Sequence, residues 1–490
     1  MTFSLLSGTI VHQVDSHCKI ICYTHFNQSQ NYFEVPTLIR DMRNLFFPVG
    51  GGNEIGASCY FIQLNGAKFL LDAGIRLHTD SIYPRFHSLY LENLLDGLWE
   101  LDGILLSHGH IDHIGALPFV VEEAQDVPMY ATLPTREIVD LQLNQSLTSA
   151  TFSREELVDF PRVKAFNALR VQRAIENITP IAWHSPITCE TCQITFFPAG
   201  HILGASMVYI ESDAGNILFT GDFTPFDQLT VPKYQLPDDL DVDLLITEST
   251  YGYQESLYVG DIDEEREHFA QKIDRCLDGG GTILIPAFAI GRSQELALIL
   301  RDLIRDGHLK PFPIYIDGLA QIACDIYEDN DVKLFGYELE KAPKDFIDAL
   351  DTFNGVIIAS SGMLLDNSMS ARYAEELLPD PRNAVFFSGY LDEESPGRKL
   401  ERLHESKGQR FRINERDIPV HADVDTYRLS AHTGSEGILS LIERVTPKKV
   451  IFVHGCPQYK TAVNIHRETC RRFQNRIEVY QANNGTPIYF

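Results

Sequence analysis

The sequence predicts a layered α/β protein that carries its functional residues at the ends of strands. Two observations support this prediction: short apolar segments alternate with stretches of helical periodicity, and several of the apolar segments end directly in a polar cluster. Interleaved strands and helices are typical of sheets covered by helices, in which functional residues collect where the strands end. At about 150 residues per domain, a chain of 490 residues predicts two to four units.

The first part of the chain reads as short strands and a hairpin. Residues 45–49 form an apolar strand that runs into a glycine turn at 50–52. Two further strands, 57–64 and 68–71, flank Asn65-Gly66. This dipeptide is a strong signal for a two-residue turn between antiparallel strands. We therefore expect a β-hairpin here.

Three later apolar segments share the form of a strand that ends in polar residues, and they are 104–106, 194–197 and 217–219. Helical periodicity is present in 135–147, and 154–158 predicts one further helical turn. Residues 1–44 alternate only weakly between apolar and polar, which predicts an N-terminal extension of a strand or two.

The second part of the chain, about 253–426, predicts an α/β domain of its own. A helix over 263–277 precedes a glycine turn at 279–281 and a buried strand at 282–286, and a second helix follows over 293–305. The same spacing recurs at three further strands, 313–316, 355–359 and 384–387. Parallel strands that alternate with helices form a doubly wound sheet. Beyond this domain, strand character returns at two segments, 449–453 and 487–490.

The most informative segment is SHGHIDH at 107–113, directly after an apolar strand. It places three imidazoles and one carboxylate within six residues. In a tight loop, His108 and His110 can point together at one ion, while Asp112 and His113 face a neighbouring ion. Imidazole nitrogen and carboxylate oxygen suit Zn²⁺, and Mn²⁺ or Fe²⁺ less well. The segment therefore predicts metal binding at the end of this strand.

Further ligands are needed, because one loop cannot saturate two ions. His201, Asp222 and His454 each follow an apolar strand, the first two with a glycine close before them. Any one of them alone would more commonly be a structural residue, but together with the 107–113 segment they predict the remaining ligands. Asp72, which follows the strand at 68–71, is predicted to orient one of the imidazoles.

These residues, Asp72, the 107–113 segment, His201 and Asp222, resemble the metallo-β-lactamase signature in order and spacing. Four later motifs are TESTYG at 247–252, IPAFAIGRSQE at 285–295, SAHT at 430–433 and VHG at 453–455. These motifs resemble the β-CASP subfamily, which includes the endonuclease of the cleavage and polyadenylation specificity factor and RNase J. The resemblance covers about 45–466. It implies an α/β fold in which a metallo-β-lactamase αββα sandwich carries an inserted β-CASP α/β domain. The expected limits are 1–44 for the extension, 45–252 and 427–490 for the sandwich, and 253–426 for the insert.

The resemblance also implies the ligands of two metal ions. One zinc would be bound by His108, His110 and His201, and a second by Asp112, His113 and His454. Asp222 and a hydroxide would bridge the two ions, and manganese could replace zinc.

The same resemblance implies the reaction. Glu248 and His432 would form the acid–base pair beside the leaving group, with Asp112 as a further catalytic residue. A histidine at position 454 is typical of the RNA-acting branch of the family. The implied activity is therefore hydrolysis of RNA phosphodiester bonds by a two-metal mechanism, with a bridging hydroxide as the nucleophile.

Residues that contact the substrate are predicted from three further segments. Residues 359–363 and 388–390 resemble family loops that hold the substrate backbone, and the predicted contacts there are Ser361, Gly362, Ser388 and Gly389. Arg292 follows a strand and a glycine turn and precedes a helix, where a phosphate could meet both the guanidinium and the helix N-terminus. A structural salt bridge is an equally good interpretation of Arg292.

Composition limits the partners. Asp and Glu number 68 against 41 Lys and Arg, for a net charge of −27. So acidic a chain repels phosphates at long range unless metal ions or a few cations act locally. Nine cysteines exclude a fully paired disulfide framework, and no apolar run approaches the ~18 residues of a membrane span. We expect a cytoplasmic protein that binds single-stranded RNA, does not enter a membrane, and works as a homodimer or with a protein partner subunit.

Two other functions fit the same core. A hydrolase of small esters, thioesters or lactones would use the same ligands, but the large insert argues against it. An inactive, nuclease-like scaffold subunit is the other alternative, and the presence of every expected ligand argues against it. Endonucleolytic and exonucleolytic cleavage both occur on this framework, so both stay open.

Overall fold

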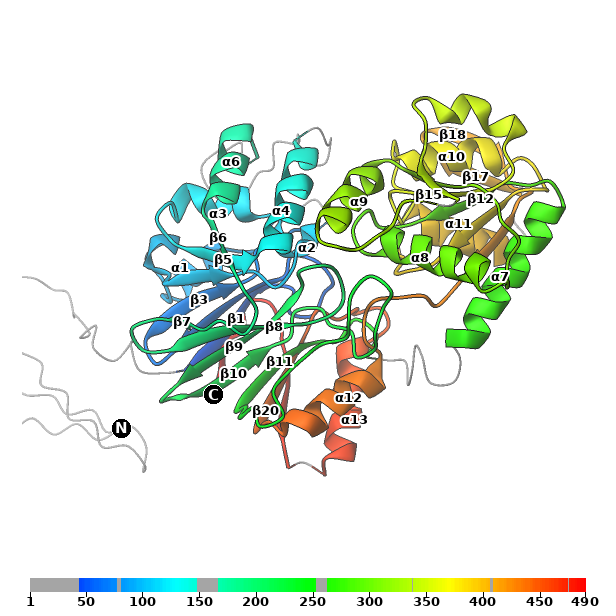
Figure 1. The fold of residues 1–490 in the computed structure, drawn as a ribbon. Coiled ribbons are helices and arrows are strands. Elements are labelled where there is room, and N and C mark those ends of the chain that lie inside the picture. Colours follow the sequence, from blue (N-terminus) through cyan, green and yellow to red (C-terminus); the bar gives the residue numbers. More distant parts are fainter. Residues whose placement is uncertain are drawn as a thin grey trace, which may run out of the picture. The chain divides into compact units, whose positions relative to one another are not determined.

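A computed structural model gives the fold, and it describes residues 44–76, 81–147, 166–252, 262–336, 338–405, 409–474 and 476–490. The predicted N-terminal extension, apart from Asn44, and the helical turn predicted at 154–158 lie outside the described residues. Three large sheets and their covering helices make up the described part (Figure 1).

The first sheet contains seven strands in the order β22-β1-β2-β3-β4-β5-β6. Leu70 and Ile104 in this sheet pack against the helices of its outer face through residues such as Leu89 and Val120. The strands are β1 Leu45–Gly50, β2 Cys59–Leu64, β3 Ala67–Leu71, β4 Gly103–Leu105, β5 Met129–Thr132, β6 Ile178–Ile181 and β22 Ile488–Tyr489. The helices on this side are α1 His87–Leu91, η2 Leu98–Glu100, α2 Ile111–Ile114, α3 Leu117–Glu123, α4 Leu133–Ser146 and α6 Ala168–Glu176.

The predicted hairpin is confirmed. β2 and β3 pair antiparallel with Leu64 opposite Ala67, so Asn65 and Gly66 form a two-residue loop. Both loop residues have positive φ, 52° at Asn65 and 86° at Gly66. Asparagine and glycine tolerate this backbone conformation better than other residues, which explains why the dipeptide ends one strand and starts the next.

The second sheet also contains seven strands, in the order β21-β20-β11-β10-β9-β8-β7. Two C-terminal helices pack on it, through residues such as Ile442 against Leu245 and Val450. The strands are β7 Ile187–Thr188, β8 Gln193–Pro198, β9 Ser206–Ser212, β10 Gly215–Phe219, β11 Leu244–Glu248, β20 Lys449–Val453 and β21 Glu478–Gln481, and the helices are α12 Ser435–Val445 and α13 Thr461–Arg472.

The two seven-stranded sheets pack face to face. One buried cluster contains Tyr60 and Phe69 from the first sheet together with Phe196, Phe219 and Ile451 from the second. Helices lie on the outer face of each sheet (Figure 1). The predicted αββα sandwich is confirmed.

The third sheet is parallel throughout, with strands in the order β14-β13-β15-β12-β16-β19. Side chains alternate between its faces: Ile283 and Ile285 pack under α7, α8 and α9, whereas Leu284 packs under α10 and α11. This is the doubly wound arrangement that the spacing predicts. The strands are β12 Ile283–Pro286, β13 Ile314–Asp317, β14 Leu339–Lys341, β15 Val356–Ala359, β16 Ala384–Phe387 and β19 Asp423–Thr426. The helices are α7 Ile262–Asp278, α8 Arg292–Arg305, α9 Leu319–Asp329, η3 Phe346–Thr352, α10 Met369–Leu377 and α11 Pro396–Glu405, with a hairpin of β17 Arg410–Ile413 and β18 Arg416–Pro419.

This third sheet is an insertion. In the sequence it lies between β11 and β20, and yet these two strands are paired neighbours in the second sheet, with Leu245 opposite Val450. The chain therefore leaves the sandwich after β11 and is back in it by α12, which precedes β20. The predicted limits of the insert, 253–426, stay a prediction. Among the described helices, none is both long and apolar enough to cross a membrane.

Candidate active site

Asp72, Glu248 and the candidate metal ligands lie at or just after the ends of six strands, β3, β4, β8, β10, β11 and β20. β3 and β4 pair parallel, and so do β10, β11 and β20. β8 is antiparallel to β9, which is antiparallel to β10, so β8 runs in the direction of β10. Within each sheet the carboxyl ends of these strands therefore point the same way, and the residues that follow them can meet.

Three of these residues have a strained backbone. The φ angles of Asp72, His201 and His454 are 60°, 56° and 49°. This left-handed region is uncommon for residues other than glycine, and such outliers collect at functional sites. All three side chains are buried, so each of these strained residues places a polar group in the interior.

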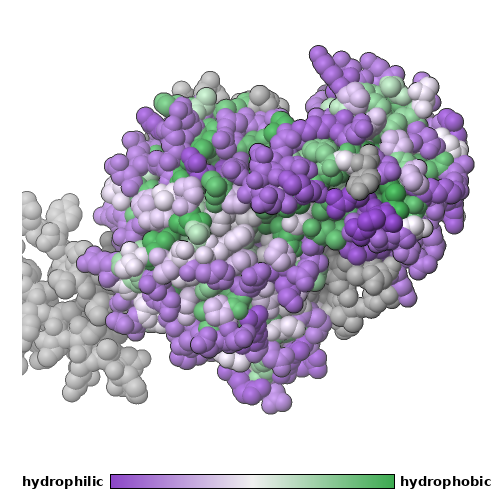
Figure 2. Space-filling view, in the orientation of Figure 1, coloured by the Kyte–Doolittle hydropathy of each residue, from purple (hydrophilic) through white to green (hydrophobic). Residues whose placement is uncertain are grey.

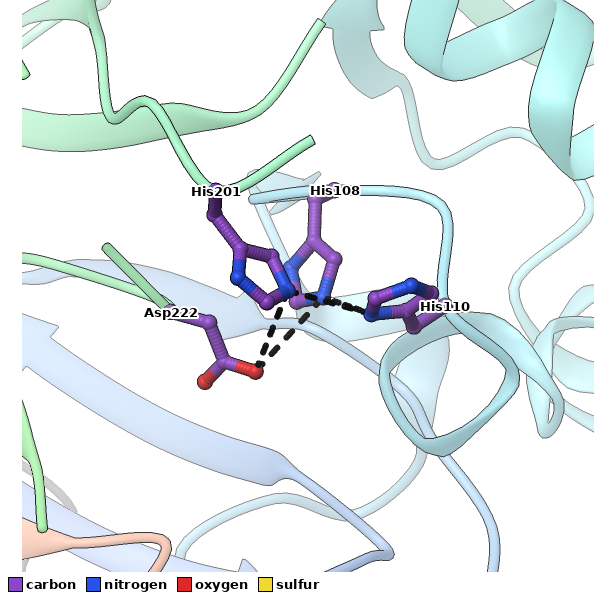
Figure 3. Close-up of side chains that lie close together, drawn as sticks. All are labelled: His108, His110, His201 and Asp222. Carbon is purple, nitrogen blue, oxygen red and sulfur yellow. Dashed lines mark hydrogen bonds and ion pairs between the residues drawn. The ribbon is translucent and has the colours of Figure 1, made fainter. Parts of the chain in front are cut away.

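The first group of candidate ligands contains His108, His110, His201 and Asp222 (Figure 3). His110 Nδ1 lies 3.1 Å from His108 Nε2 and 3.2 Å from His201 Nε2. Asp222 Oδ2 lies 3.7 Å from His108 Nε2 and 3.8 Å from His201 Nε2. Ligands about 2.0–2.1 Å from a tetrahedral zinc lie ~3.3 Å from one another. The spacing of these four donors is close to that of ligands around one ion.

The second group contains Asp112, His113 and His454. Asp112 Oδ2 lies 3.3 Å from His454 Nε2 and 3.8 Å from His113 Nε2. Asp222 faces this group as well, with Oδ2 at 3.5 Å from His113 Nε2 and Oδ1 at 3.5 Å from His454 Nδ1. Asp222 Oδ1 is buried, and among the described residues it has no hydrogen-bond partner. A buried carboxylate oxygen without a donor is the group that a cation would satisfy.

Each of the five imidazoles has a partner for its outer nitrogen. These contacts direct the other nitrogen of each ring inward as a lone-pair donor, which is the arrangement that metal-binding histidines use. The outer contacts are His108 Nδ1 to Ser107 Oγ at 3.0 Å, His110 Nε2 to the Ile290 carbonyl at 3.4 Å, His113 Nδ1 to Asp72 Oδ2 at 2.8 Å, His201 Nδ1 to the Ala431 carbonyl at 3.3 Å, and His454 Nδ1 to Thr250 Oγ1 at 3.0 Å.

The ionisation states in this cluster favour a cation. Burial, with added repulsion from neighbouring rings, lowers the pKa of the three imidazoles of the first group, His108, His110 and His201. Burial opposes ionisation of Asp112 and Asp222, but the imidazoles of His113 and His454 hold the pKa of both carboxyls below its usual range. Burial likewise opposes protonation of His113, and the carboxylates of Asp222 and Asp112 outweigh it and raise its pKa. Neutral imidazoles and ionised carboxylates are the forms that bind metal. His108, His110, His201 and the two carboxylates favour these forms, whereas His113 would have to give up a proton to an incoming ion.

Glu248 and His432 form a hydrogen-bonded pair beside the cluster. His432 Nδ1 donates to Glu248 Oε2 at 3.0 Å. Glu248 is fully buried, and its Oε1 accepts from the Phe223 amide at 2.9 Å. Burial opposes protonation of His432, but the carboxylates of Glu248 and Asp222 raise its pKa to about 9. The pair can therefore keep a proton on His432 near neutral pH.

A cavity of about 340 Å³ opens onto these residues. His110, Asp112 and His432 line it from the sandwich, and the inserted domain contributes residues such as Phe288 and Tyr390. The sandwich and the inserted domain thus enclose one space that is lined by His432 and by members of both ligand groups, which are His110 and Asp222 of the first and Asp112 and His454 of the second.

Comparisons with known proteins agree with this architecture. Residues 52–257 match the metallo-beta-lactamase superfamily, residues 293–400 the Beta-Casp domain, and residues 417–480 the Zn-dependent metallo-hydrolase RNA specificity domain. The chain is 30% identical to the RNase J-like protein of Methanocaldococcus jannaschii, over 83% of this chain and 91% of that protein. The chain belongs to the β-CASP ribonucleases of the metallo-β-lactamase superfamily.

Two further matches define the extent of the similarity. The endoribonuclease ysh1 of Schizosaccharomyces pombe is 29% identical over 91% of this chain, and the chain spans 58% of that protein. A crystal structure of a protein of unknown function from Enterococcus faecalis V583 shares the fold, with a TM-score of 0.52 and 14% identity over 91% of this chain and 100% of that chain. The fold and the His/Asp cluster indicate that this β-CASP protein binds divalent metal.

The predicted substrate contacts lie mostly beside the cavity of the β-CASP protein rather than on its wall. A side chain at Gly362 would meet the Phe288 amide nitrogen at 2.8 Å, and one at Gly389 would lie 3.8 Å from the Phe288 ring. Gly362 therefore leaves room for Phe288, which lines the cavity, whereas a Cβ at Gly389 would make only ordinary contact with the ring. Ser361 Oγ accepts from the Leu365 amide. Ser388 Oγ is buried and has no partner among the described residues.

Arg292 is not among the residues that line the cavity. It begins α8, its side chain is 7% exposed, and its Nε has no hydrogen-bond partner among the described residues. The salt bridge that was the alternative interpretation of Arg292 is also absent from the described part of the chain. A role for Arg292 in binding phosphate stays a prediction.

Three residues that sequence reasoning missed contribute to the site of this β-CASP protein. Ser107 and Thr250 hold outer nitrogens of the cluster, and Phe288 lines the cavity. A signal for all three was present, because each lies within or next to a quoted motif. The sequence alone does not indicate which of the small polar residues near a candidate ligand contacts that ligand.

Gly74→Ala is expected to disrupt the second ligand group. A Cβ at Gly74 would lie 1.6 Å from the Asp112 carbonyl oxygen and 2.6 Å from the His113 amide nitrogen, so the segment that carries both ligands must move. We expect the second ligand group to lose its metal and the free energy of unfolding to fall by about 1–3 kcal/mol, as overpacking generally costs. Metal content and thermal unfolding measure this. Gly103→Ala is the control, because its Cβ would meet nothing nearer than 3.5 Å, and an equal loss in both variants would contradict the prediction.

Proposed function

We propose that this protein is a two-zinc ribonuclease that hydrolyses the phosphodiester bonds of single-stranded RNA. The observation that supports it most is the position of Asp222, whose carboxylate faces both ligand groups. One ion would be held by His108, His110 and His201, and the other by Asp112, His113 and His454. The donors are imidazole nitrogens and carboxylate oxygens, which suit zinc, with manganese as the alternative metal.

The bound ions would supply a water of lowered pKa and neutralise the charge of the attacked phosphate. The residues of the protein would orient the ligands and hold the ions in place. The five outer hydrogen bonds fix the imidazoles in orientation, so the donors need little rearrangement when the ions bind. Asp112, a predicted catalytic residue, lines the cavity and would hold its ion close to the phosphate.

His432 is the proposed general acid. Its Nδ1 is occupied by Glu248, so the proton available for the departing oxygen is the one on Nε2. Glu248 accepts hydrogen bonds from Phe223 and Thr250 as well as from His432, which holds its carboxylate in one place. A histidine fixed in this way can protonate an alkoxide leaving group near neutral pH.

RNA is the favoured substrate because the C-terminal segment matches a domain described as an RNA specificity domain. That segment, 417–480, contains both His432 and His454. An ester hydrolase would not need the inserted wall of the cavity, and an inactive scaffold would not need every ligand. Assays with single-stranded RNA, single-stranded DNA and a chromogenic ester, beside elemental analysis, separate the three functions. A circular RNA added to the set identifies endonucleolytic cleavage, since a circle has no ends.

RNA binding is expected to depend only modestly on salt. Figure 2 shows a face on which hydrophilic residues, whatever the sign of their charge, predominate. The net charge is −27. Among the described residues, the one Arg or Lys that lines the cavity is Arg76, and it is paired with Glu54 at 2.6 Å. Few cations therefore face the substrate. Each phosphate contact on a single strand contributes about −0.7 to the slope of the logarithm of the binding constant against the logarithm of the salt concentration. We therefore expect a slope of roughly −1 to −3.

The measurement is RNA binding by metal-loaded His432→Ala protein across a salt series. A slope steeper than about −6 would indicate a long basic track on the protein and would contradict this picture. Weak binding by the protein alone would agree with a cytoplasmic enzyme that relies on a basic partner subunit or on residues 1–44 for its grip on RNA.

A further inference from the structure

Thr250 lies between the two halves of the proposed machinery. Its Oγ1 is 2.6 Å from Glu248 Oε2 and 3.0 Å from His454 Nδ1. The residue is 2% exposed, and it lines the cavity. A third contact of the same hydroxyl, to the His454 carbonyl, is longer at 3.4 Å. One small side chain thus touches both the acid–base pair and a candidate ligand of the second ion.

The donors and acceptors determine the direction of these hydrogen bonds. A threonine hydroxyl has one proton to donate, and an ionised carboxylate can only accept. Thr250 therefore donates to Glu248 and accepts from the Nδ1–H of His454. Asp222 Oδ1 lies 3.5 Å from the same nitrogen, but the two atoms form no hydrogen bond.

This direction fixes the tautomer of His454. With the proton on Nδ1, the lone pair is on Nε2, and Nε2 is the nitrogen that faces Asp112 Oδ2 at 3.3 Å. Asp112 and His454 belong to the same ligand group. Thr250 therefore turns the lone pair of His454 toward the position of the second ion.

The same hydroxyl acts on Glu248. A continuous chain of hydrogen bonds runs from His432 through Glu248 and Thr250 to His454, with lengths of 3.0, 2.6 and 3.0 Å. We infer that Thr250 is a positioning residue that aligns His454 for the second metal ion and, through the same oxygen, holds Glu248 for His432. The inference rests on the proposed function and adds to it a direct link between metal binding and proton transfer.

Thr250→Val tests this link, because valine keeps the shape of threonine and removes the hydroxyl. Loss of an outer partner of a metal-binding histidine typically weakens metal affinity by about 10–100-fold. Only one of the two ions is expected to respond, since the first ligand group has no contact with Thr250. Competition with a chromogenic zinc chelator measures both affinities without any cleavage assay.

Two further variants complete the set. Thr250→Ser keeps the hydroxyl and is expected to bind both ions within about threefold of the wild type. Ser249→Ala is the matched control, because Ser249 Oγ donates to the Val453 carbonyl at 2.8 Å and contacts neither His454 nor Glu248 through its side chain. It is expected to leave both metal affinities unchanged. If Thr250→Val does not fold, Thr250→Ala compared with Thr250→Ser provides the same contrast.

Cleavage provides the second readout. At saturating zinc, Thr250→Val is expected to lower kcat by about tenfold with little change in KM, because Glu248 has lost one of its donors, and Thr250→Ser is expected to restore kcat. Equal zinc affinities and equal kcat in Thr250→Val and the wild type would overturn the inference, as would an equal loss in Ser249→Ala. Failure of the proposed function looks different, since the wild type itself would then bind no pair of ions or leave RNA intact.

Discussion

The double substitution His110→Ala with Asp112→Ala is expected to remove both metal ions and to lower RNA cleavage by more than about 10³-fold, because two-metal catalysis needs both sites. Each alanine deletes one donor from one ligand group. Asp222, which faces both groups, would then keep its negative charge in a buried site without the metal ions that offset it.

Elemental analysis of the purified protein and a single-stranded RNA cleavage assay measure this result. The exposed pair Asp306 and His308 has the same spacing in the reverse order, so Asp306→Ala with His308→Ala is the matched control and should retain both metals and activity. A wild-type protein that carries no transition metal and stays fully active in EDTA would contradict the metal centre altogether.

His432→Ala is expected to keep both metal ions and to slow cleavage by about 10²–10⁴-fold, which is the usual size of a general-acid contribution. His432 belongs to neither ligand group, and its Nδ1 is directed at Glu248. The loss should therefore be in proton transfer to the leaving oxygen and not in metal binding.

A substrate with a better leaving group is the matched test of this role. Such a leaving group needs less protonation, so His432→Ala should recover part of its activity on it, while the wild type gains less. Glu248→Gln should slow cleavage in the same direction, because it removes the charge that favours a proton on His432. Loss of metal in His432→Ala would instead identify His432 as a ligand and contradict the assignment.

The grouping of the candidate ligands could be predicted from the sequence for a local reason. His108, His110, Asp112 and His113 lie within one short loop, and His201, Asp222 and His454 each follow an apolar strand by a few residues. Parallel strand ends lie together, so adjacency to a strand end is sufficient to bring such residues into one place. The alternation of strands and helices predicted a layered α/β fold, and the αββα sandwich with its inserted domain was implied by the resemblance of the motifs to the family.

The outer partners of the ligands could not be predicted, because they depend on contacts across the chain. The carbonyl that holds His110 belongs to Ile290, 180 residues away, and the one that holds His201 belongs to Ala431, 230 residues away. Backbone carbonyls have no signature in a sequence. The glycine turn before Arg292 could be predicted from the sequence. That its side chain is buried could not, because this depends on how α8 packs against the rest of the domain.

The separation of these partners along the chain has a consequence for how the enzyme is made. Asp112 and His454, which face each other at 3.3 Å, are 342 residues apart, and the acceptor for His110 is supplied by the inserted domain. A ribosome that has not yet translated residues 432 and 454 has therefore synthesised neither the proposed proton donor nor one of the candidate ligands. Until residue 454 has been added, the nascent chain therefore meets cellular RNAs without a complete candidate centre.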